Sequence, residues 1–144
     1  MEIKEKKLKE NAIIPTYQTV GSVGADLCAL LSEPIEIHPG KTALIPTGLS
    51  FAIPEGYGGF VFARSGLASK KGLAPANKVG VIDADYRGEL MVALFNHGND
   101  PQTVSPGDRI AQFVILPVAV ASFVETDSLE DTARGCGGFG STGA

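Results

Sequence analysis

Cysteine and histidine are scarce in this sequence, which holds two of each among its 144 residues. The cysteines, Cys28 and Cys136, form neither a disulfide framework nor the spacing of a metal-ligand motif. Zinc sites draw on several cysteine and histidine ligands, whereas these thiols and the imidazoles of His38 and His97 are scattered along the chain. The sequence therefore predicts two reduced thiols in an intracellular protein, and no zinc site.

Long apolar runs and an excess of basic residues are also missing. No apolar stretch approaches the roughly 18 residues of a membrane span, and the charged residues 1–8 lack the apolar core of a signal peptide. We therefore expect a cytoplasmic protein. The formal net charge is −4, whereas non-specific nucleic-acid binders are basic. A role on DNA or RNA is therefore disfavoured, while a phosphorylated small molecule needs only local cations or a metal.

Glycine and proline, at 18 and 9 residues, interrupt short apolar stretches rich in β-branched residues. Strands are predicted at 45–53, 60–62, 81–82, 90–95 and 110–120, and turns at 39–40, 54–56 and 106–107. Within 45–53, Ile45, Leu49, Phe51 and Ile53 alternate onto one face, opposite Ser50 and Ala52. Only residues 65–71 have the composition of a helix. Many short strands between turns indicate an all-β sandwich or barrel.

The chain is predicted to form one domain, residues 1–125, followed by a C-terminal arm, residues 126–144. The apolar periodicity stops at about residue 126, and the arm becomes glycine-rich after Arg134. Exposed chain ends of this composition are poorly ordered unless something ties them down. We therefore expect a tail that is mobile when no ligand is bound.

Two segments in the first half of the chain carry candidate site residues. Asp26 follows a glycine turn and enters an apolar strand, where it either holds a metal-bound water or caps the turn. The pair Ser65-Gly66 opens the predicted helix and offers backbone N–H groups to an anion. The guanidinium of Arg64, beside this pair, has several N–H donors in a fixed geometry that suits phosphate. An ordinary helix cap next to a solvated arginine explains the same residues equally well.

Two further segments lie in the second half. Residues 77–89 form two extended pieces around a polar turn, in which three acids and an aromatic residue lie close together, so an acid here is able to act as a general base. The alternative is a hairpin turn rich in Asp and Gly. In residues 107–112, Gln112 falls on an otherwise apolar strand face, where its amide needs partners from the backbone or from a ligand.

The glycine-rich tail is the fifth candidate. Residues 137–143 superficially resemble a phosphate loop, but they lack the Gly-Lys-Ser/Thr ending of a Walker loop. Glycines allow backbone N–H groups to surround phosphate oxygens, and Phe139 offers a flat surface for stacking on a base. The alternative is a disordered end without a role.

Together and in this order, the five motifs resemble those of the trimeric dUTPase family, the deoxyuridine 5′-triphosphate nucleotidohydrolases. The resemblance runs from Gly21 to Gly143 and is most specific in three strings: Arg-Ser-Gly-Leu-Ala at 64–68, Ile-Asp-Ala-Asp-Tyr-Arg-Gly-Glu at 82–89, and Arg-Gly-Cys-Gly-Gly-Phe-Gly-Ser-Thr-Gly at 134–143. Ala63 departs from the proline of many members, and Cys136 occupies a position that the family leaves variable.

This resemblance implies a jelly-roll-like β-sandwich that assembles as a homotrimer, with active sites at subunit interfaces and the tail reaching over a neighbour's site. The implied reaction hydrolyses dUTP to dUMP and pyrophosphate by attack of water on the α-phosphorus, which limits uracil in DNA and supplies dUMP for thymidylate synthesis. Asp83 is the implied general base, and Asp26 is implied to hold hydrated Mg²⁺ indirectly, through water.

The resemblance also implies a set of substrate-binding residues. These are Arg64, Ser65, Gly66, Asn77, Gly80, Val81, Ile82, Tyr86, Gln112, Arg134, Phe139, Gly140, Ser141 and Thr142. Tyr86 is expected under the deoxyribose, where it leaves no room for a 2′-hydroxyl, and Phe139 is expected to stack on uracil. Ser141 and Thr142 are expected to bind the β- and γ-phosphates together with Arg134.

Three alternatives belong to other classes. A dCTP deaminase of the same fold has a catalytic glutamate in the strand after the Asp-containing turn, where this chain has Ala93. A second is a non-catalytic regulatory protein of the dUTPase fold; the five intact motifs argue for activity, and the sequence is silent on a regulatory side role. A third, a purely structural jelly roll, would not need Asp83, Tyr86 and the Phe139 tail at once. Pyrophosphate release from dUTP, against ammonia release from dCTP, distinguishes the two enzymes.

Overall fold

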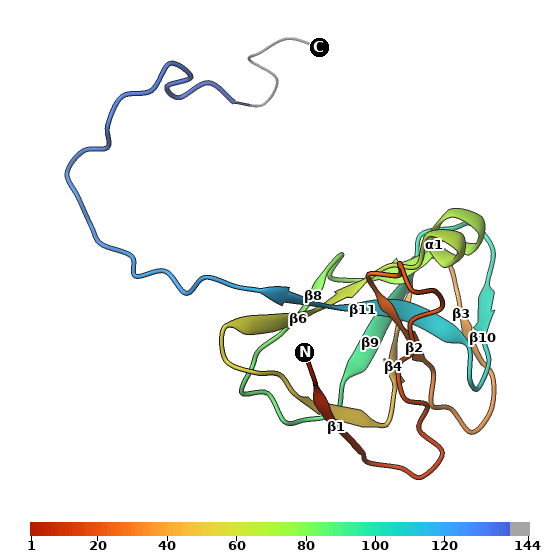
Figure 1. Cartoon of the computed structure of the whole chain (residues 1–144). Coiled ribbons are helices and arrows are strands. Elements are labelled where there is room, and N and C mark those ends of the chain that lie inside the picture. The colour runs from red at the N-terminus through yellow and green to blue at the C-terminus, as the bar shows by residue number, and fades with distance from the viewer. Residues whose placement is uncertain (139–144) are drawn as a thin grey trace.

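The computed structural model describes residues 1–138, so the predicted contacts of Phe139, Gly140, Ser141 and Thr142 lie outside the described residues. Its elements are short strands and one helix (Figure 1). In chain order they are β1 (Lys4–Lys7), β2 (Ala25–Cys28), β3 (Ile35–Ile37), β4 (Thr42–Pro46), β5 (Leu49–Ala52), β6 (Tyr57–Phe62), α1 (Ser65–Lys71), β7 (Leu73–Pro75), β8 (Gly80–Ile82), β9 (Met91–Asn96), β10 (Gln102–Val104) and β11 (Arg109–Pro117).

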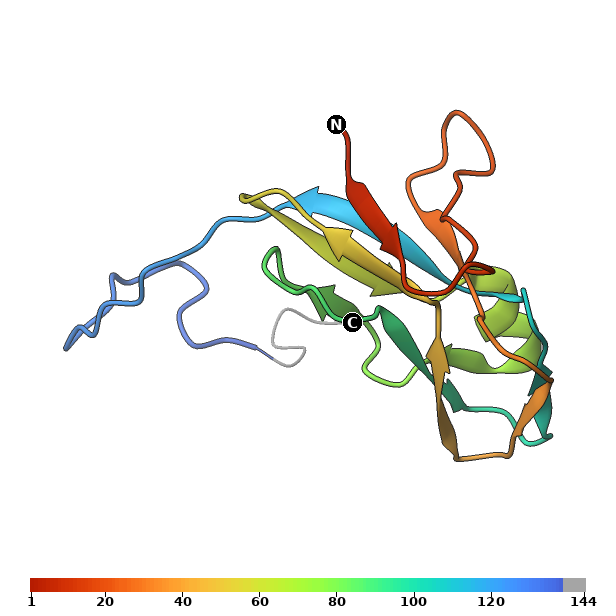
Figure 2. The ribbon, with the colours of Figure 1, turned by 90° about the horizontal axis from the view of Figure 1, so that it is seen from below.

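All strand pairs are antiparallel and group into four small sheets. The largest has the order β2-β11-β6-β8, a second has the order β4-β9-β7, and β1-β5 and β10-β3 form two pairs. Seen from below, the sheets wrap around one interior (Figure 2). The predicted all-β class with one short helix is therefore confirmed.

The interior is built from the alternating apolar residues of these strands. Its most deeply buried side chains include Leu27, Ile45, Leu49, Leu73, Leu90, Leu94 and Ile110, each at most 2% exposed. Phe51 and Phe113 pack against each other with ring centroids 4.9 Å apart, which joins β5 to β11. The core thus connects the β1–β5 pair to β11, one of the two central strands of the largest sheet.

The helix has the predicted bounds, Ser65–Lys71. It ends because Gly72 adopts the left-handed conformation, with φ at 66°, and its N–H closes on the carbonyls of Ala68 and Leu67. The three predicted turns each hold a left-handed glycine as well: Gly40, Gly56 and Gly107. The backbone freedom of glycine therefore determines where the helix ends and where these three turns lie.

The single strand predicted at 45–53 is wrong, because the chain forms β4 and β5 with a break between them. Gly48 has φ at 70°, and a Cβ there would collide with side chains of Leu30 and Ala12. Ser50, expected opposite the core face, is instead 6% exposed. Its hydroxyl donates a hydrogen bond to the carbonyl of Arg87, a residue that the strand pattern alone does not bring near.

Several strands have no counterpart in the sequence-based prediction. β1 consists of Lys4–Lys7, four charged and exposed residues, and pairs with β5. β3, β7 and β10 have three residues each. Such segments are too short or too polar for a hydrophobic period to predict them, and they become strands because a distant partner satisfies their backbone.

The strand predicted to reach residue 120 ends at Pro117. Every residue from 118 to 136 is exposed, and this segment runs away from the folded body (Figure 1). Among its apolar side chains, Val120, Phe123 and Leu129 are 95%, 97% and 86% exposed. Within residues 1–138, no helix combines the length and apolar character needed to cross a membrane.

We predict that Gly59→Ala destabilises the fold. A Cβ at Gly59 would lie 2.6 Å from Phe113 and 2.8 Å from Ile53, two side chains fixed in the core. Overpacking of this kind costs about 1 to 3 kcal/mol in the free energy of unfolding, measured by urea denaturation at a fixed protein concentration. Gly21→Ala is the matched control, since nothing lies within 4 Å of its Cβ position. Equal unfolding midpoints for both variants would contradict the packing described for β6.

Candidate active site

A buried carboxylate held by two arginines lies at one end of the largest sheet. Asp26 on β2 is 4% exposed and binds Arg64 Nε through Oδ1 and Arg109 Nη1 through Oδ2, both at 3.0 Å. Arg64 also donates to the carbonyl of Arg109 at 2.9 Å. Three segments that are distant in the sequence therefore meet here: the Asp26 turn, the start of α1 and the start of β11.

The charges of this cluster sum to +1, because two guanidinium groups face one carboxylate. Each arginine is partly exposed, at 25% for Arg64 and 47% for Arg109, so the positive charge is accessible from solvent. The charged residues that line an adjoining hollow of about 310 Å³ are both arginines, Lys70 and Lys71 of α1, and one acid, Asp108, so cations are in excess there. The arrangement suits a polyanionic ligand.

The predicted phosphate-side residues lie around this cluster. Ser65 and Gly66 are exposed in the first turn of α1, directly after Arg64. Gln112 pairs with Asp26 across the β2–β11 ladder and with Phe62 on the other side. The structure therefore brings together Asp26, Arg64, Ser65, Gly66 and Gln112.

Arg109 is a functional candidate that the sequence reading missed. Its contact with Asp26 depends on a register irregularity between Arg109 and Ala111 at the start of β11. A charged residue at the start of an apolar strand was the available signal. Strand alternation gives no indication that a bulge turns its side chain toward β2.

Cys28 follows Asp26 by two residues and is half-buried. Burial is the main cause that raises the pKa of its thiol, and the nearby carboxylate of Asp26 raises that pKa further, while Arg109 and Arg64 act in the opposite direction. A thiol with a raised pKa remains protonated at neutral pH and is a poor nucleophile. Both cysteines are free, as predicted.

A second group of site residues lines a pocket of about 250 Å³ beside β8. Asn77, Gly80, Val81 and Ile82 form one side, and residues 91–93 of β9 form part of the other. A Cβ at Gly80 would lie 3.1 Å from Val61 and 3.5 Å from the Asn77 amide nitrogen, so only glycine fits there without displacing a neighbour. Ala93, the position at which the deaminase alternative expects a glutamate, is one of these lining residues.

The turn after β8 carries Asp83 and Tyr86. Tyr86 N–H donates to the carbonyl of Asp83 at 3.2 Å, which closes the turn. The Arg87 guanidinium donates to the carbonyls of Ala84 and Tyr86 at 2.6 Å and 2.9 Å. Asp83 is exposed, and Tyr86 is 45% exposed, so both side chains are accessible from solvent.

These two groups of residues do not meet within one chain. Ile82 pairs with Gly59, near the beginning of β6, whereas Arg64 lies five residues beyond Gly59 at the other end. At ~3.3 Å per extended residue, the separation along β6 is about 16 Å. Asp83, which follows Ile82, lies farther still from the arginine cluster, because the strands are antiparallel.

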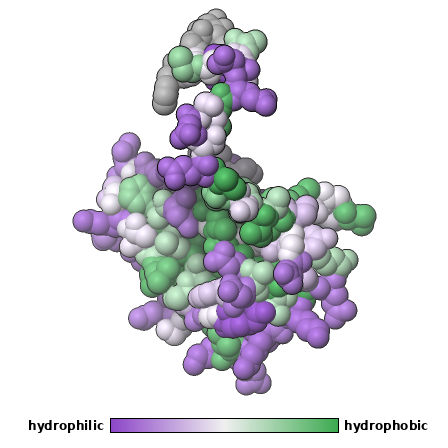
Figure 3. All heavy atoms as spheres, turned by 90° about the vertical axis from the view of Figure 1, so that its left-hand side faces the viewer, coloured by the Kyte–Doolittle hydropathy of each residue, from purple (hydrophilic) through white to green (hydrophobic). Residues whose placement is uncertain are grey.

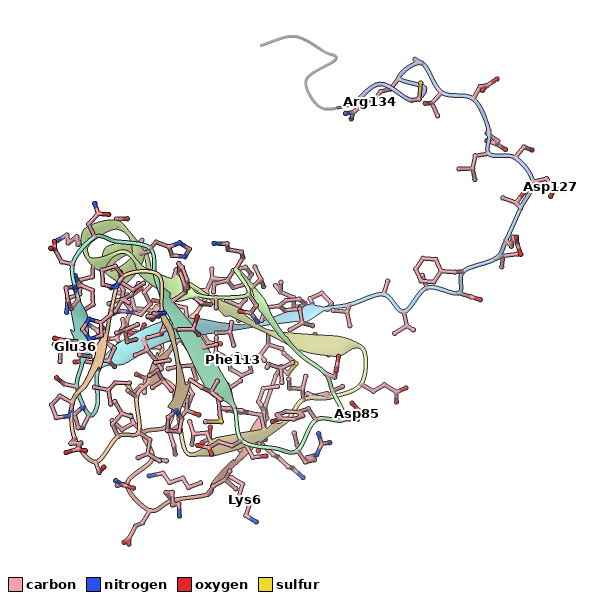
Figure 4. The ribbon with its side chains drawn as sticks, turned by 180° about the vertical axis from the view of Figure 1, so that it is seen from behind. Lys6, Glu36, Asp85, Phe113, Asp127 and Arg134 are labelled. Carbon is pink, nitrogen blue, oxygen red and sulfur yellow. The ribbon has the colours of Figure 1, made fainter. Side chains whose placement is uncertain are left out.

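Arg134 meets neither group. It is exposed on the C-terminal segment, and its Nε donates to the nearby carbonyl of Gly137 at 2.8 Å. Figure 4 shows Arg134 well away from the body of the protein and from Asp85, which marks the turn after β8. One chain therefore presents three separate parts of the predicted site.

Comparison with known proteins gives a consistent result. The sequence model of the dUTPase family matches residues 10–143. A deoxyuridine 5′-triphosphate nucleotidohydrolase from Desulfitobacterium hafniense is 58% identical over 131 residues, which are 90% of this chain and 87% of the relative.

Two solved structures of phage proteins have the same fold. A mutant dUTPase of Staphylococcus bacteriophage 80alpha, with dUpNHpp, matches over 99% of both chains at 27% identity and a TM-score of 0.90. A mutant dUTPase from phage phi11 of S. aureus, described with a structural Mg(II) ion, covers 91% of this chain and 100% of its own at 25% identity and a TM-score of 0.81. The family match and the 58% identity show that this chain belongs to the dUTPase family.

Proposed function

We propose that this dUTPase converts dUTP to dUMP and pyrophosphate by attack of water on the α-phosphorus, with Asp83 as the general base. The position of Asp83 carries the proposal: it is an exposed carboxylate directly after a pocket with a glycine wall. A carboxylate at the end of a strand accepts a proton from water while its backbone stays fixed. The reaction limits uracil in DNA and supplies dUMP for thymidylate synthesis.

Uracil enters the pocket lined by Asn77, Gly80, Val81 and Ile82. The open volume of about 250 Å³ beside these residues supports this assignment, because it leaves room for a flat base against the backbone of β8. A site built to satisfy the donors and acceptors of one base leaves buried groups unpaired with another. Tyr86 packs under the deoxyribose and excludes the 2′-hydroxyl.

The triphosphate binds at the arginine cluster. Arg64, Ser65, Gly66 and Gln112 contact the phosphates, and the net charge of +1 at the cluster supports this role in a protein of net charge −4. An opposite unit charge at ~4 Å is worth about 4 kcal/mol at an effective dielectric constant of roughly 20. Positioning and charge neutralisation supply most of the rate in phosphoryl transfer.

The dUTPase family uses Mg²⁺, and the residues of this chain fit an ion that arrives on the triphosphate. Residues 1–138 contain no group of three His, Cys, Asp or Glu side chains able to hold a metal by themselves. A carboxylate has about four lone-pair positions that accept hydrogen bonds. Asp26 uses one of them on each oxygen for an arginine. Asp26 would hold the hydrated ion indirectly, by accepting a hydrogen bond from one of its waters at a remaining position, and the ion would neutralise phosphate charge.

The complete site is shared between the subunits of a homotrimer. A general base acts within ~3 Å of its water, whereas Asp83 and the arginine cluster lie at opposite ends of β6 in one chain. The face from which the C-terminal segment leaves the body also carries a concentration of apolar surface (Figure 3). Residues 1–125 form the domain, and the arm, residues 126–144, reaches a neighbour's site with Arg134, Phe139, Gly140, Ser141 and Thr142.

We predict that purified protein with Mg²⁺ releases pyrophosphate from dUTP and not from dCTP, dTTP or UTP. Unpaired buried groups disfavour cytosine, and Tyr86 disfavours the ribose of UTP. Pyrophosphate and ammonia are measured in the same reactions. Ammonia from dCTP would contradict the assigned reaction class, and equal turnover of UTP would contradict the role of Tyr86.

We predict that Asp83→Ala lowers kcat for dUTP by about 10² to 10⁴-fold, the range that general base catalysis contributes. Binding of dUTP, measured by calorimetry, stays close to that of the unaltered protein because the pocket and the arginine cluster are intact. Asp100→Asn, a change at an exposed acid in the loop between β9 and β10, serves as the matched control. Substantial residual turnover by Asp83→Ala would show that another group takes the proton.

We predict that deleting residues 134–144 leaves a folded trimer with strongly reduced activity. Co-expressing this truncated chain with Asp83→Ala, each under a different affinity tag, then yields mixed trimers in which some sites combine an intact Asp83 with an intact tail from another chain. Those mixed trimers regain activity that neither parent has. Absence of recovery in mixed trimers of verified composition would show that the base and the tail act from the same chain.

A further inference from the structure

Two buried hydroxyl groups near the break between β4 and β5 are not used by the proposed reaction. Thr47 is 0% exposed and Ser50 is 6% exposed. Buried hydroxyl groups need hydrogen-bond partners, and both find them in one distant segment. Thr47 Oγ1 donates to the carbonyl of Leu90 at 2.6 Å, and Ser50 Oγ donates to the carbonyl of Arg87 at 2.7 Å.

Two more hydrogen bonds join the same segments. The Glu89 carboxylate accepts the N–H of Gly48 at 2.7 Å, and Leu90 N–H donates to the carbonyl of Leu49 at 2.8 Å. The regular β4–β9 ladder ends just before this point, at the pair Pro46 and Met91. Because proline has no N–H and Gly48 turns the backbone, side chains take over the connection where the ladder stops.

The anchored segment, residues 87–90, supports Tyr86. The Tyr86 hydroxyl donates to the carbonyl of Glu89 at 3.0 Å. Its ring lies so close to Gly88 that a Cβ there would be 2.6 Å from Cζ and 2.9 Å from Cε2. Tyr86 N–H in turn donates to the carbonyl of Asp83. We call the hydrogen bonds between residues 47–50 and 87–90 the anchor. Continuous contacts therefore connect the anchor, through Tyr86, to the turn that begins at Asp83.

We propose that Thr47, Ser50 and Glu89 are positioning residues, which hold the turn bearing Asp83 and Tyr86 in register for reaction. This rests on the proposed function, since it assumes that Asp83 activates water and that Tyr86 contacts the sugar. None of the three is among the residues proposed to contact the substrate. Their hydroxyl and carboxylate groups act through the backbone of residues 87–90, and small displacements of catalytic groups reduce rates strongly.

The test compares variants that remove each contact with variants that keep it. Thr47→Val preserves the shape of the side chain and removes the donor, whereas Thr47→Ser keeps the hydroxyl. Glu89→Ala removes the acceptor, whereas Glu89→Gln keeps a carbonyl oxygen. We expect Thr47→Val and Glu89→Ala each to lower kcat for dUTP on the order of tenfold and to reduce the ratio of kcat/KM for dUTP to that for UTP. The conservative partners should stay within about twofold of the unaltered protein.

Ile37→Val is the control for a purely structural effect. Ile37 is a buried residue of β3, and its loss of one methyl group lowers stability without touching the anchor. The thermal unfolding midpoint of Ile37→Val is compared with those of the anchor variants. Its ratio of kcat/KM for dUTP to kcat/KM for UTP should not change. An equal change of ratio in Ile37→Val would overturn the proposal, as would unaltered kcat and ratio in both Thr47→Val and Glu89→Ala.

Two further variants keep the outcome decisive. If Thr47→Val does not fold, Ser50→Ala and the Glu89 pair test the same connection. Asp83→Ala is measured alongside, so that turnover by that variant counts against the proposed base. An inactive Asp83→Ala together with unaltered anchor variants counts against the anchor alone.

Discussion

The antiparallel register of β6 is the constraint on which the arrangement of the site depends. β6 pairs with β11 on one side and with β8 on the other. Its C-terminal end continues into Arg64 and the helix, while its beginning lies beside the end of β8 and the end of β11. One strand therefore separates the cationic cluster from the turn with Asp83, and the C-terminal segment leaves the body at the Asp83 end. The proposed site needs both parts, and under our proposal another copy of the chain completes it.

At the cationic end, a buried charge organises the cluster. Asp26 is nearly inaccessible, and removing a carboxylate from water is costly unless it is paired. Two arginines from distant segments provide that pairing and remain partly exposed themselves. The acid thus fixes the direction of the guanidinium groups and leaves an excess positive charge. Its predicted contact with hydrated Mg²⁺ is compatible with this role, because pairing with the arginines leaves lone-pair positions free.

At the other end, hydrogen bonds take the place of charge pairing. The turn with Asp83 and Tyr86 has little core of its own, and it is held by polar groups of residues 47–50 and by the contact of Tyr86 with Gly88. Tyr86 is half-exposed on this support, so one side remains accessible. The two ends of β6 are thus stabilised differently, in agreement with the different roles that we propose for them: charge for phosphate, and a fixed surface for base and sugar.

The sequence by itself determined the all-β class, the helix at residues 65–71, the turns, the motifs and, through their resemblance, the family. These features depend on local backbone preferences and on residue order, which a single chain displays directly. The sequence did not reveal the break at Gly48, the burial of Ser50, the charged strand β1 or the pairing of Arg109 with Asp26. Each of these depends on a partner far away in the chain: a carbonyl of residue 87, strand β5, or a bulge in β11. Only the tertiary structure decided them, because a buried polar group takes its place from whatever partner the fold brings within hydrogen-bond distance.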